Sequence, residues 1–245
     1  MKRITVLGFL TTQNMESKEA GKKLFEIIYK KASSFMPQKY DNGEPIERRF
    51  NYSQLDEVLS IWENGFLWKR SSPMASGSFW LGSTHGLHNA VYLSIEGLKF
   101  NTKELMLLLT EGSKLFNSTI GYIHRIYEEE LLDLEFYKNQ VMPFSQGVTT
   151  HDLKKGLPGI CWMMYFGEPY ITLIGREKLL SSPVYRSEDL KPGIVLQLTE
   201  SINTPEEDYE AFKSIREKVI LHLGYELFSF SDKKEKQIPD FSLSK

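Results

Sequence analysis

A pair of histidines carries the first pattern in this sequence that could do chemistry. His85 and His88 lie three residues apart in Thr84-His85-Gly86-Leu87-His88. Histidine pairs bind metal ions, but a protein site needs a third and usually a fourth ligand. No Cys-x-x-Cys or His-Glu-x-x-His motif accompanies the pair. We therefore interpret these residues as loop histidines and expect no metal site.

The chain has one cysteine, Cys161, inside the apolar run Ile160–Met164. A nucleophilic cysteine needs exposure and an electropositive neighbour, so this setting favours a core position. His151, with Asp152 beside it, is a candidate base for the thiol, but proximity in sequence fixes no geometry. A single cysteine allows no intramolecular disulfide, which favours a reducing, cytoplasmic compartment. We expect no catalytic residue and no cofactor.

An acidic run, Glu128, Glu129 and Glu130 with Asp133 nearby, is the third pattern. Such a cluster can bind a cation, exchange protons or simply face solvent. It can also match a basic patch on a partner protein, such as the active site of a nuclease.

Composition narrows the class of protein further. The chain has 245 residues, of which 41% are hydrophobic, 25% charged and 13% aromatic, which is typical of a globular protein with a large core. A formal net charge of −2 does not steer a protein to nucleic acid or to an anionic membrane. No run approaches the roughly 20 apolar residues of a membrane span, and the N-terminal run at residues 2–10 reads as a strand.

Hydrophobic periodicity predicts the helices and strands that position these residues. Strands are predicted at residues 2–10, 66–70, 77–82, 89–95, 120–127, 160–165, 194–199 and 225–230. Helices are predicted at residues 16–34, 55–62, 102–115, 169–175 and 205–221, and the polar tail from Ser231 is expected to fray. This pattern predicts an α+β protein.

An internal echo suggests two similar halves. The first copy consists of a strand at 91–95, Asn101-Thr102, a helix and Gly121-Tyr122. The second copy consists of a strand at 194–198, Asn203-Thr204, a helix and Gly224-Tyr225. We predict one domain over residues 1–245, with pseudo-repeated halves at about 1–135 and 136–231 and a polar tail at 232–245. Each half is predicted to hold a βαβ unit, in mixed or antiparallel sheets with helices packed on one face. The alternative to a true repeat is that the two strand–helix–strand units are similar by chance.

Three blocks of sequence carry a resemblance to a known family. The first consists of residues 37–40, 44–45 and Trp62. The second consists of residues 66–70, 76–80 and 88–89, and the third of residues 157–162, 165–170 and 174–179. The third block is the most specific, and it resembles the centre of α+β immunity proteins from bacterial polymorphic toxin systems. The chain is most similar to the immunity protein 52 family over about Met36 to Phe230. That resemblance implies a cytoplasmic protein, encoded beside a toxin, that binds and blocks the toxin domain, commonly a nuclease. It implies no catalytic residues.

Our first hypothesis is therefore a toxin-binding protein that acts by occlusion, as a monomer or homodimer, with no nucleic-acid or membrane partner. The contacts are expected from aromatic, arginine and acidic side chains. The candidates are Trp62, Trp68, Arg70, Trp80, Glu128, Glu129, Glu130 and Asp133. The alternatives are a small enzyme that uses Cys161 or the His85/His88 pair, and a structural or regulatory protein that dimerises through a sheet face.

Overall fold

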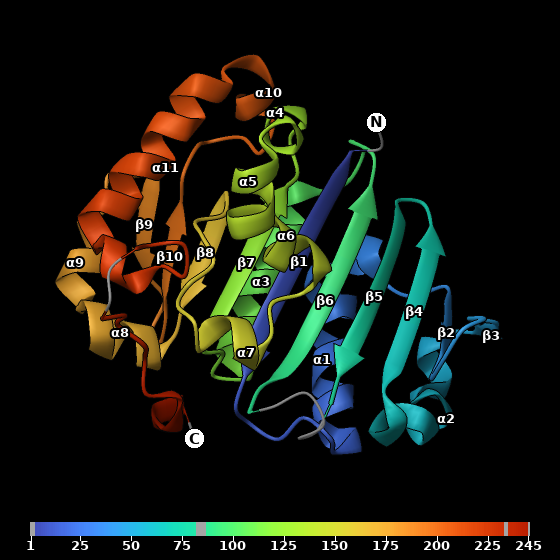
Figure 1. Ribbon diagram of the computed structural model, residues 1–245. Helices are drawn as coiled ribbons and strands as arrows, with labels where there is room; N and C mark the ends of the chain where they lie inside the picture. The colour runs from blue at the N-terminus through green and yellow to red at the C-terminus, as the bar shows by residue number, and fades with distance from the viewer. Residues whose placement is uncertain (1–2, 82–86, 233–234, 245) are drawn as a thin grey trace.

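One antiparallel sheet of ten strands runs through the part of the chain that the structure, a computed structural model, describes: residues 3–81, 87–232 and 235–244 (Figure 1). Its strand order is β3-β2-β4-β5-β6-β1-β7-β8-β10-β9. The strands are β1 (Ile4–Thr11), β2 (Lys39–Asp41), β3 (Arg48–Arg49), β4 (Phe66–Ser71), β5 (Met74–Trp80), β6 (Asn89–Glu96), β7 (Ile120–Arg125), β8 (Met163–Phe166), β9 (Arg186–Asp189) and β10 (Ile194–Gln197). The predicted α+β class and antiparallel pairing are confirmed.

The longest helices begin at side-chain caps that their sequences supply. The side chains of Ser17, Asn101 and Asp208 accept hydrogen bonds from backbone N–H groups in the first turns of α1, α3 and α11. The helices are α1 (Lys18–Lys31), α2 (Leu55–Val58), α3 (Thr102–Leu115), α4 (Glu128–Leu132), α5 (Leu134–Phe136), α6 (Met142–Gln146), α7 (Thr150–Leu153), α8 (Glu168–Ile174), α9 (Arg176–Leu180), α10 (Thr204–Glu207) and α11 (Tyr209–Leu223). None of these helices is long and apolar enough to cross a membrane.

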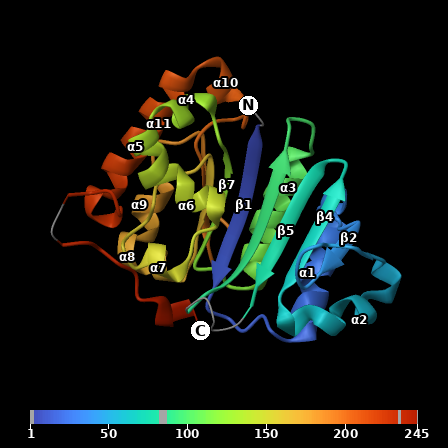
Figure 2. The same cartoon turned by 45° about the vertical axis from the view of Figure 1, so that its right-hand side comes forward.

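Helices cover both faces of the sheet, which corrects the prediction of helices on one face (Figure 2). Phe9 of β1 meets Gly112 of α3 on one face. The adjacent residue Gly8 lies under the ring of Tyr122, whose hydroxyl donates to Phe144 O of α6 on the other face. Alternate residues of a strand point to opposite faces, so β1 is buried between two helix layers. We call these the α3 face and the α6 face.

The two predicted halves form one continuous sheet with a repeated order of elements. The first block runs β1, α1, β5, β6, α3, with β2 to β4 inserted, and the second runs β8, α9, β9, β10, α11. In the sheet, β5-β6-β1 and β8-β10-β9 lie on either side of β7 in mirrored order. In the sequence echo, β6 corresponds to β10 and α3 corresponds to α11. These pairs also occupy equivalent places in the two blocks. A common origin of the two blocks remains a prediction.

The C-terminal elements differ from their predictions. The predicted strand at 225–230 is wrong: Tyr225–Leu227 forms a 3-10 turn, and Phe228 makes an isolated parallel bridge to Leu157. Both edges of β10 are paired with β8 and β9, so β10 offers this segment no free edge. The predicted helix at 205–221 is divided at Asp208, which leaves helical geometry and caps α11. The tail does not simply fray. The Lys236 ammonium donates to Phe228 O at 2.8 Å, and Phe241 is buried against the ring of His88.

The outermost strands of the sheet are short and charged. The two residues of β3, Arg48 and Arg49, are both exposed. At the opposite edge, β9 has the sequence Arg-Ser-Glu-Asp, in which Arg186 pairs with Glu188. Neither strand shows the apolar alternation by which strands are predicted, and neither was predicted.

Candidate partner-binding surface

The predicted contact residues do not form one surface, and two of the tryptophans are core residues. Trp62 and Trp68 are 0% and 2% exposed, so their prediction as partner contacts is wrong. Trp62 packs against Phe25 and Phe79, and its indole N–H donates to Met15 O at 2.7 Å. An indole that lies on an apolar face and has an internal partner stabilises the fold instead of facing a partner.

Arg70 and Trp80 are partly accessible but lie on different faces. The guanidinium of Arg70 donates to Met36 O at 2.7 Å and to Ser72 O at 2.5 Å, which fixes it against its own backbone. The alternation along β4 and β5 places Arg70 on the α3 face and Trp80 on the α6 face. Their role as contacts remains a prediction.

Glu130 is a buried structural residue, so its prediction as a surface contact is also wrong. Its side chain is 0% exposed. One carboxylate oxygen accepts from Arg216 Nη2 at 2.5 Å, and the other lies 2.9 Å from His124 Nε2. His124 Nδ1 accepts the backbone N–H of Trp162 at 3.3 Å, so both ring nitrogens have partners inside the fold.

The charge of this buried group is set by its partners. Burial acts to raise the pKa of Glu130, but His124 and Arg216 outweigh that effect and lower it to about 2. The pKa of Arg216 is raised, because attraction to Glu130 exceeds the opposing effect of burial. The guanidinium also lies over the rings of Phe136 and Phe212, at 5.1 and 4.7 Å from their centroids. The pair ties α4 and α5 to α11.

Glu128, Glu129 and Asp133 are exposed on the opposite side of the same segment. They lie at the end of the molecule where α4 and α10 are side by side (Figure 1), joined by the hydrogen bond of Tyr127 Oη to Ile202 O at 2.8 Å. Further exposed acidic residues belong to the same elements. We call the whole set the acidic end: Glu128, Glu129, Asp133, Glu135, Glu206, Glu207 and Asp208.

The acidic end contains a cavity of about 530 Å³. Glu128, Glu129 and Glu206 line it together with the apolar side chains of Leu98, Ile126 and Leu131. Arg3 reaches Glu206 at 3.6 Å from the rim. Carboxylates beside an apolar wall suit the stem and head of a lysine or arginine from a partner.

Two leucines beside the acidic end are unusually exposed. Leu132 is 78% exposed and Leu134 is 64% exposed, on either side of Asp133. Single exposed leucines are ordinary, but two on either side of an exposed carboxylate form an apolar contact next to a charged one. One sequence signal could have indicated this apolar contact: Leu-Leu-Asp-Leu directly follows three glutamates. The second acidic run, Glu206-Glu207-Asp208, was also missed.

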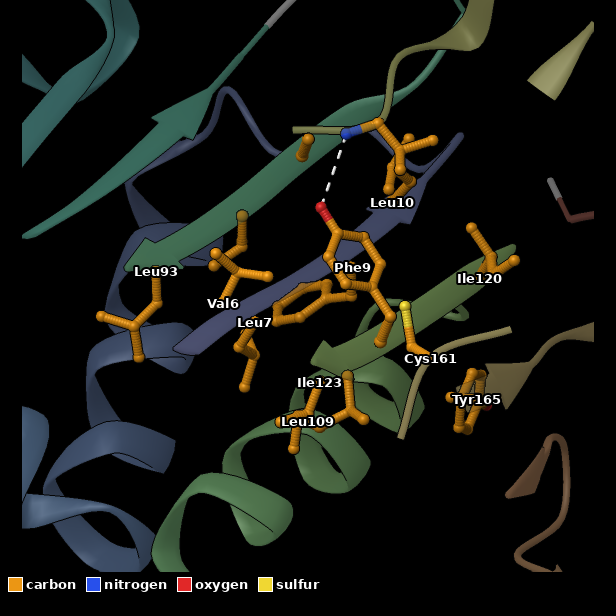
Figure 3. Close-up of a cluster of buried hydrophobic side chains, with 14 of the residues drawn as sticks. Val6, Leu7, Phe9, Leu10, Leu93, Leu109, Ile120, Ile123, Cys161 and Tyr165 are labelled. Carbon is orange, nitrogen blue, oxygen red and sulfur yellow. Dashed lines mark hydrogen bonds between the residues drawn. The ribbon is translucent and has the colours of Figure 1, made fainter. Parts of the chain in front are cut away.

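Of the residues proposed for an enzyme, those that the structure describes lie in different settings. Cys161 is buried in the hydrophobic cluster drawn in Figure 3, and burial raises the pKa of its thiol well above the ordinary value. His88 is buried between Thr150 and Thr119, and burial lowers its pKa to about 4. His85 lies outside the described residues. His151 is exposed on α7. Among the described residues, no group of three or more His, Cys, Asp or Glu side chains could hold a metal ion.

Thiol labelling checks this description of Cys161. We expect native protein at pH 8 to react negligibly with a thiol-specific disulfide reagent, because the buried thiol is neither ionised nor accessible. The same protein in denaturing guanidinium should release one equivalent of chromophore, which serves as the control. Rapid labelling of the native protein would contradict the structure and favour the enzyme hypothesis.

Comparison with known proteins shows a similarity of fold. No protein-family model matches the chain, and no curated protein matches it. The fold is similar to that of a solved structure, the Pseudomonas aeruginosa T6SS protein PA0821. The match has a TM-score of 0.52 at 11% sequence identity, and it covers 89% of this chain and 76% of that chain. At this identity the similarity shows the fold alone.

Proposed function

We propose that this protein is an immunity protein: it binds a cognate bacterial toxin domain in the cytoplasm and blocks it by occlusion. The acidic end carries the proposal, because it combines a carboxylate-lined cavity with two exposed leucines. A basic, substrate-binding surface of a toxin, such as that of a nuclease, has the complementary charge. The function is the one that the sequence resemblance to immunity proteins implies, and the fold shared with the T6SS protein PA0821 is consistent with it.

In this proposal the protein does no chemistry and needs no cofactor. Glu128, Glu129 and Glu206 contact basic side chains of the toxin, while Leu132 and Leu134 supply the apolar contact. Charged rim residues mainly govern the rate of association and partner choice, and desolvated apolar anchors slow dissociation. The buried pair of Glu130 and Arg216 holds α4 and α5 in place beneath that surface.

The direct test is protection of growth. A toxin domain encoded by the gene immediately beside this one is expressed in a bacterial host, with and without this protein. We expect this protein to restore growth and to co-purify with the toxin domain in a defined complex. A toxin domain that stays lethal when both proteins are soluble would contradict the proposal.

Reversal of charge at the acidic end tests the surface itself. We expect the double variant Glu128→Lys/Glu129→Lys to weaken the affinity for the toxin domain at least ~10-fold and to reduce the dependence of association rate on salt. Surface plasmon resonance at two ionic strengths measures both effects. The matched control is Glu57→Lys/Glu63→Lys, which makes the same change in charge at exposed positions in α2 and in the turn that follows it. Equal affinities of the two double variants would exclude the acidic end as the contact surface.

A further inference from the structure

A second cavity, of about 220 Å³, lies on the α6 face away from the acidic end. It occupies the part of the sheet where β4, β5 and β6 extend beyond the cover of the short helices (Figure 1). Glu44 and Ile46, from the connection between β2 and β3, form one wall, and Ser145 and Gln146 at the end of α6 form the other. The volume is below the roughly 300 Å³ at which drug-sized pockets begin, so it suits a single small ring.

The floor of this cavity presents three hydroxyl groups. Ser76 and Ser78 lie two residues apart on β5, so they share a face, and Ser94 of β6 lies directly opposite Ser76. All three line the cavity, and within the described residues no hydrogen bond occupies their hydroxyls. Opposite residues of an antiparallel pair have Cβ atoms about 5 Å apart, which places donors and acceptors within reach of one small ligand.

An aromatic side chain borders these hydroxyls. Trp80 is half-buried and lines the cavity. Its ring lies edge-on to that of Tyr92, with centroids 4.7 Å apart and planes at 67°. Tyr92 in turn is fixed by the hydrogen bond that its hydroxyl donates to Val148 O. The indole is therefore held by packing, and its electron-rich face suits the slightly positive C–H groups of a saturated ring.

We propose that this cavity binds a neutral carbohydrate, one sugar ring at a time. The chemistry is that of a hydroxyl-lined floor beside an indole, with no lysine, arginine or aspartate in the lining. The one carboxylate, that of Glu44, already accepts the backbone N–H of Ile46 at 3.3 Å. A phosphate or another anion would find no cation here. A pyranose sugar carries hydroxyls on adjacent carbons around the edge of its ring and C–H groups on its faces, whereas an extended peptide points alternate side chains to opposite sides.

Saturation-transfer NMR tests the proposal on the full-length protein, with glucose and N-acetylglucosamine as probes. We expect saturation of at least one sugar, with a Kd of about 1 mM, because the ligand is small and the cavity shallow. The variant Trp80→Ala should abolish the signal, and Ser78→Val/Ser94→Val should weaken binding at least 5-fold. The matched control, Ser214→Val on α11, should bind as the wild type does. Circular dichroism confirms that each variant is folded.

Three outcomes would overturn the proposal. The first is no saturation transfer to either sugar at 20 mM. The second is binding that survives both Trp80→Ala and the serine double variant in folded protein. The third is tighter binding of N-acetyl-dialanine amide, a peptide probe, at the same residues. Toxin protection by the acidic end does not depend on this cavity, so failure here leaves the proposed function standing, and the reverse also holds.

Discussion

The variant Glu130→Gln is expected to lower the free energy of unfolding by about 3–5 kcal/mol. Glutamine keeps the size of the side chain but removes its charge, so the guanidinium of Arg216 is left buried without a counter-ion. The hydrogen bond of Arg216 to the carboxylate, at 2.5 Å, is lost or weakened. Denaturation in urea, followed by circular dichroism, measures the change.

The neighbouring residue provides a matched control. Glu129→Gln makes the same chemical change at an exposed position one residue earlier, and it is expected to change stability by less than about 0.5 kcal/mol. A further variant separates charge from shape: Glu130→Met/Arg216→Met removes both charges and should recover much of the stability lost in Glu130→Gln. If Glu130→Gln and Glu129→Gln have the same stability, the buried pair does not hold this region.

The same pair makes stability depend on pH. The pKa of Glu130 is near 4.5 in the unfolded chain and about 2 in the folded protein, so the unfolded chain takes up its proton first as pH falls. The contribution of the carboxylate is fully present above about pH 4.5 and is lost as pH falls towards 2. We therefore expect the difference between wild type and Glu130→Gln to shrink across that window.

The variant Gly167→Ala is expected to destabilise the fold by about 3 kcal/mol or more. A Cβ at this position would lie 1.8 Å from the carbonyl oxygen of Ser118 and 2.9 Å from its carbonyl carbon. Overpacking usually costs about 1–3 kcal/mol, and here the obstacle is backbone, which cannot change rotamer. Gly167 also donates its N–H to Thr119 O at 3.0 Å, next to the start of α8. Relief of the clash would move this junction.

Gly43→Ala is the control for that substitution. A Cβ at Gly43 would meet nothing within 4 Å, and its backbone is not in the left-handed region. We expect this variant to unfold within about 0.5 kcal/mol of the wild type. Thermal and urea unfolding of both variants measures the contrast. A Gly167→Ala protein as stable as Gly43→Ala would show that β8 and the loop before β7 can separate without cost.

The elements that sequence predicted are those with a strong apolar period. β1, β6 and α3 were predicted close to their observed bounds, because their hydrophobic residues recur at the spacing of a strand or a helix. The short strands β2, β3 and β9 carry charged residues and pair only because neighbouring strands already exist. That information is tertiary, so no local pattern reports it.

The candidate surface was predicted only in part, for a related reason. Successive residues of a helix point about 100° apart, so three glutamates in a row cannot all face the same way. Which of them turns inward depends on Arg216, which lies 86 residues further along the chain. Residue type alone likewise could not separate Trp62 and Trp68, which are buried, from Trp80, which is half-buried.

The two outermost strands bear on how this protein behaves when it is concentrated. An open sheet presents unpaired N–H and C=O groups at both edges, where another chain can add a strand and begin a fibril. Here one edge ends in two exposed arginines and the other in Arg-Ser-Glu-Asp. A second molecule approaching β3 in register would bring four guanidinium groups together. Recruitment of a second sheet at the β3 edge is thus opposed by like charge at the first pair of residues.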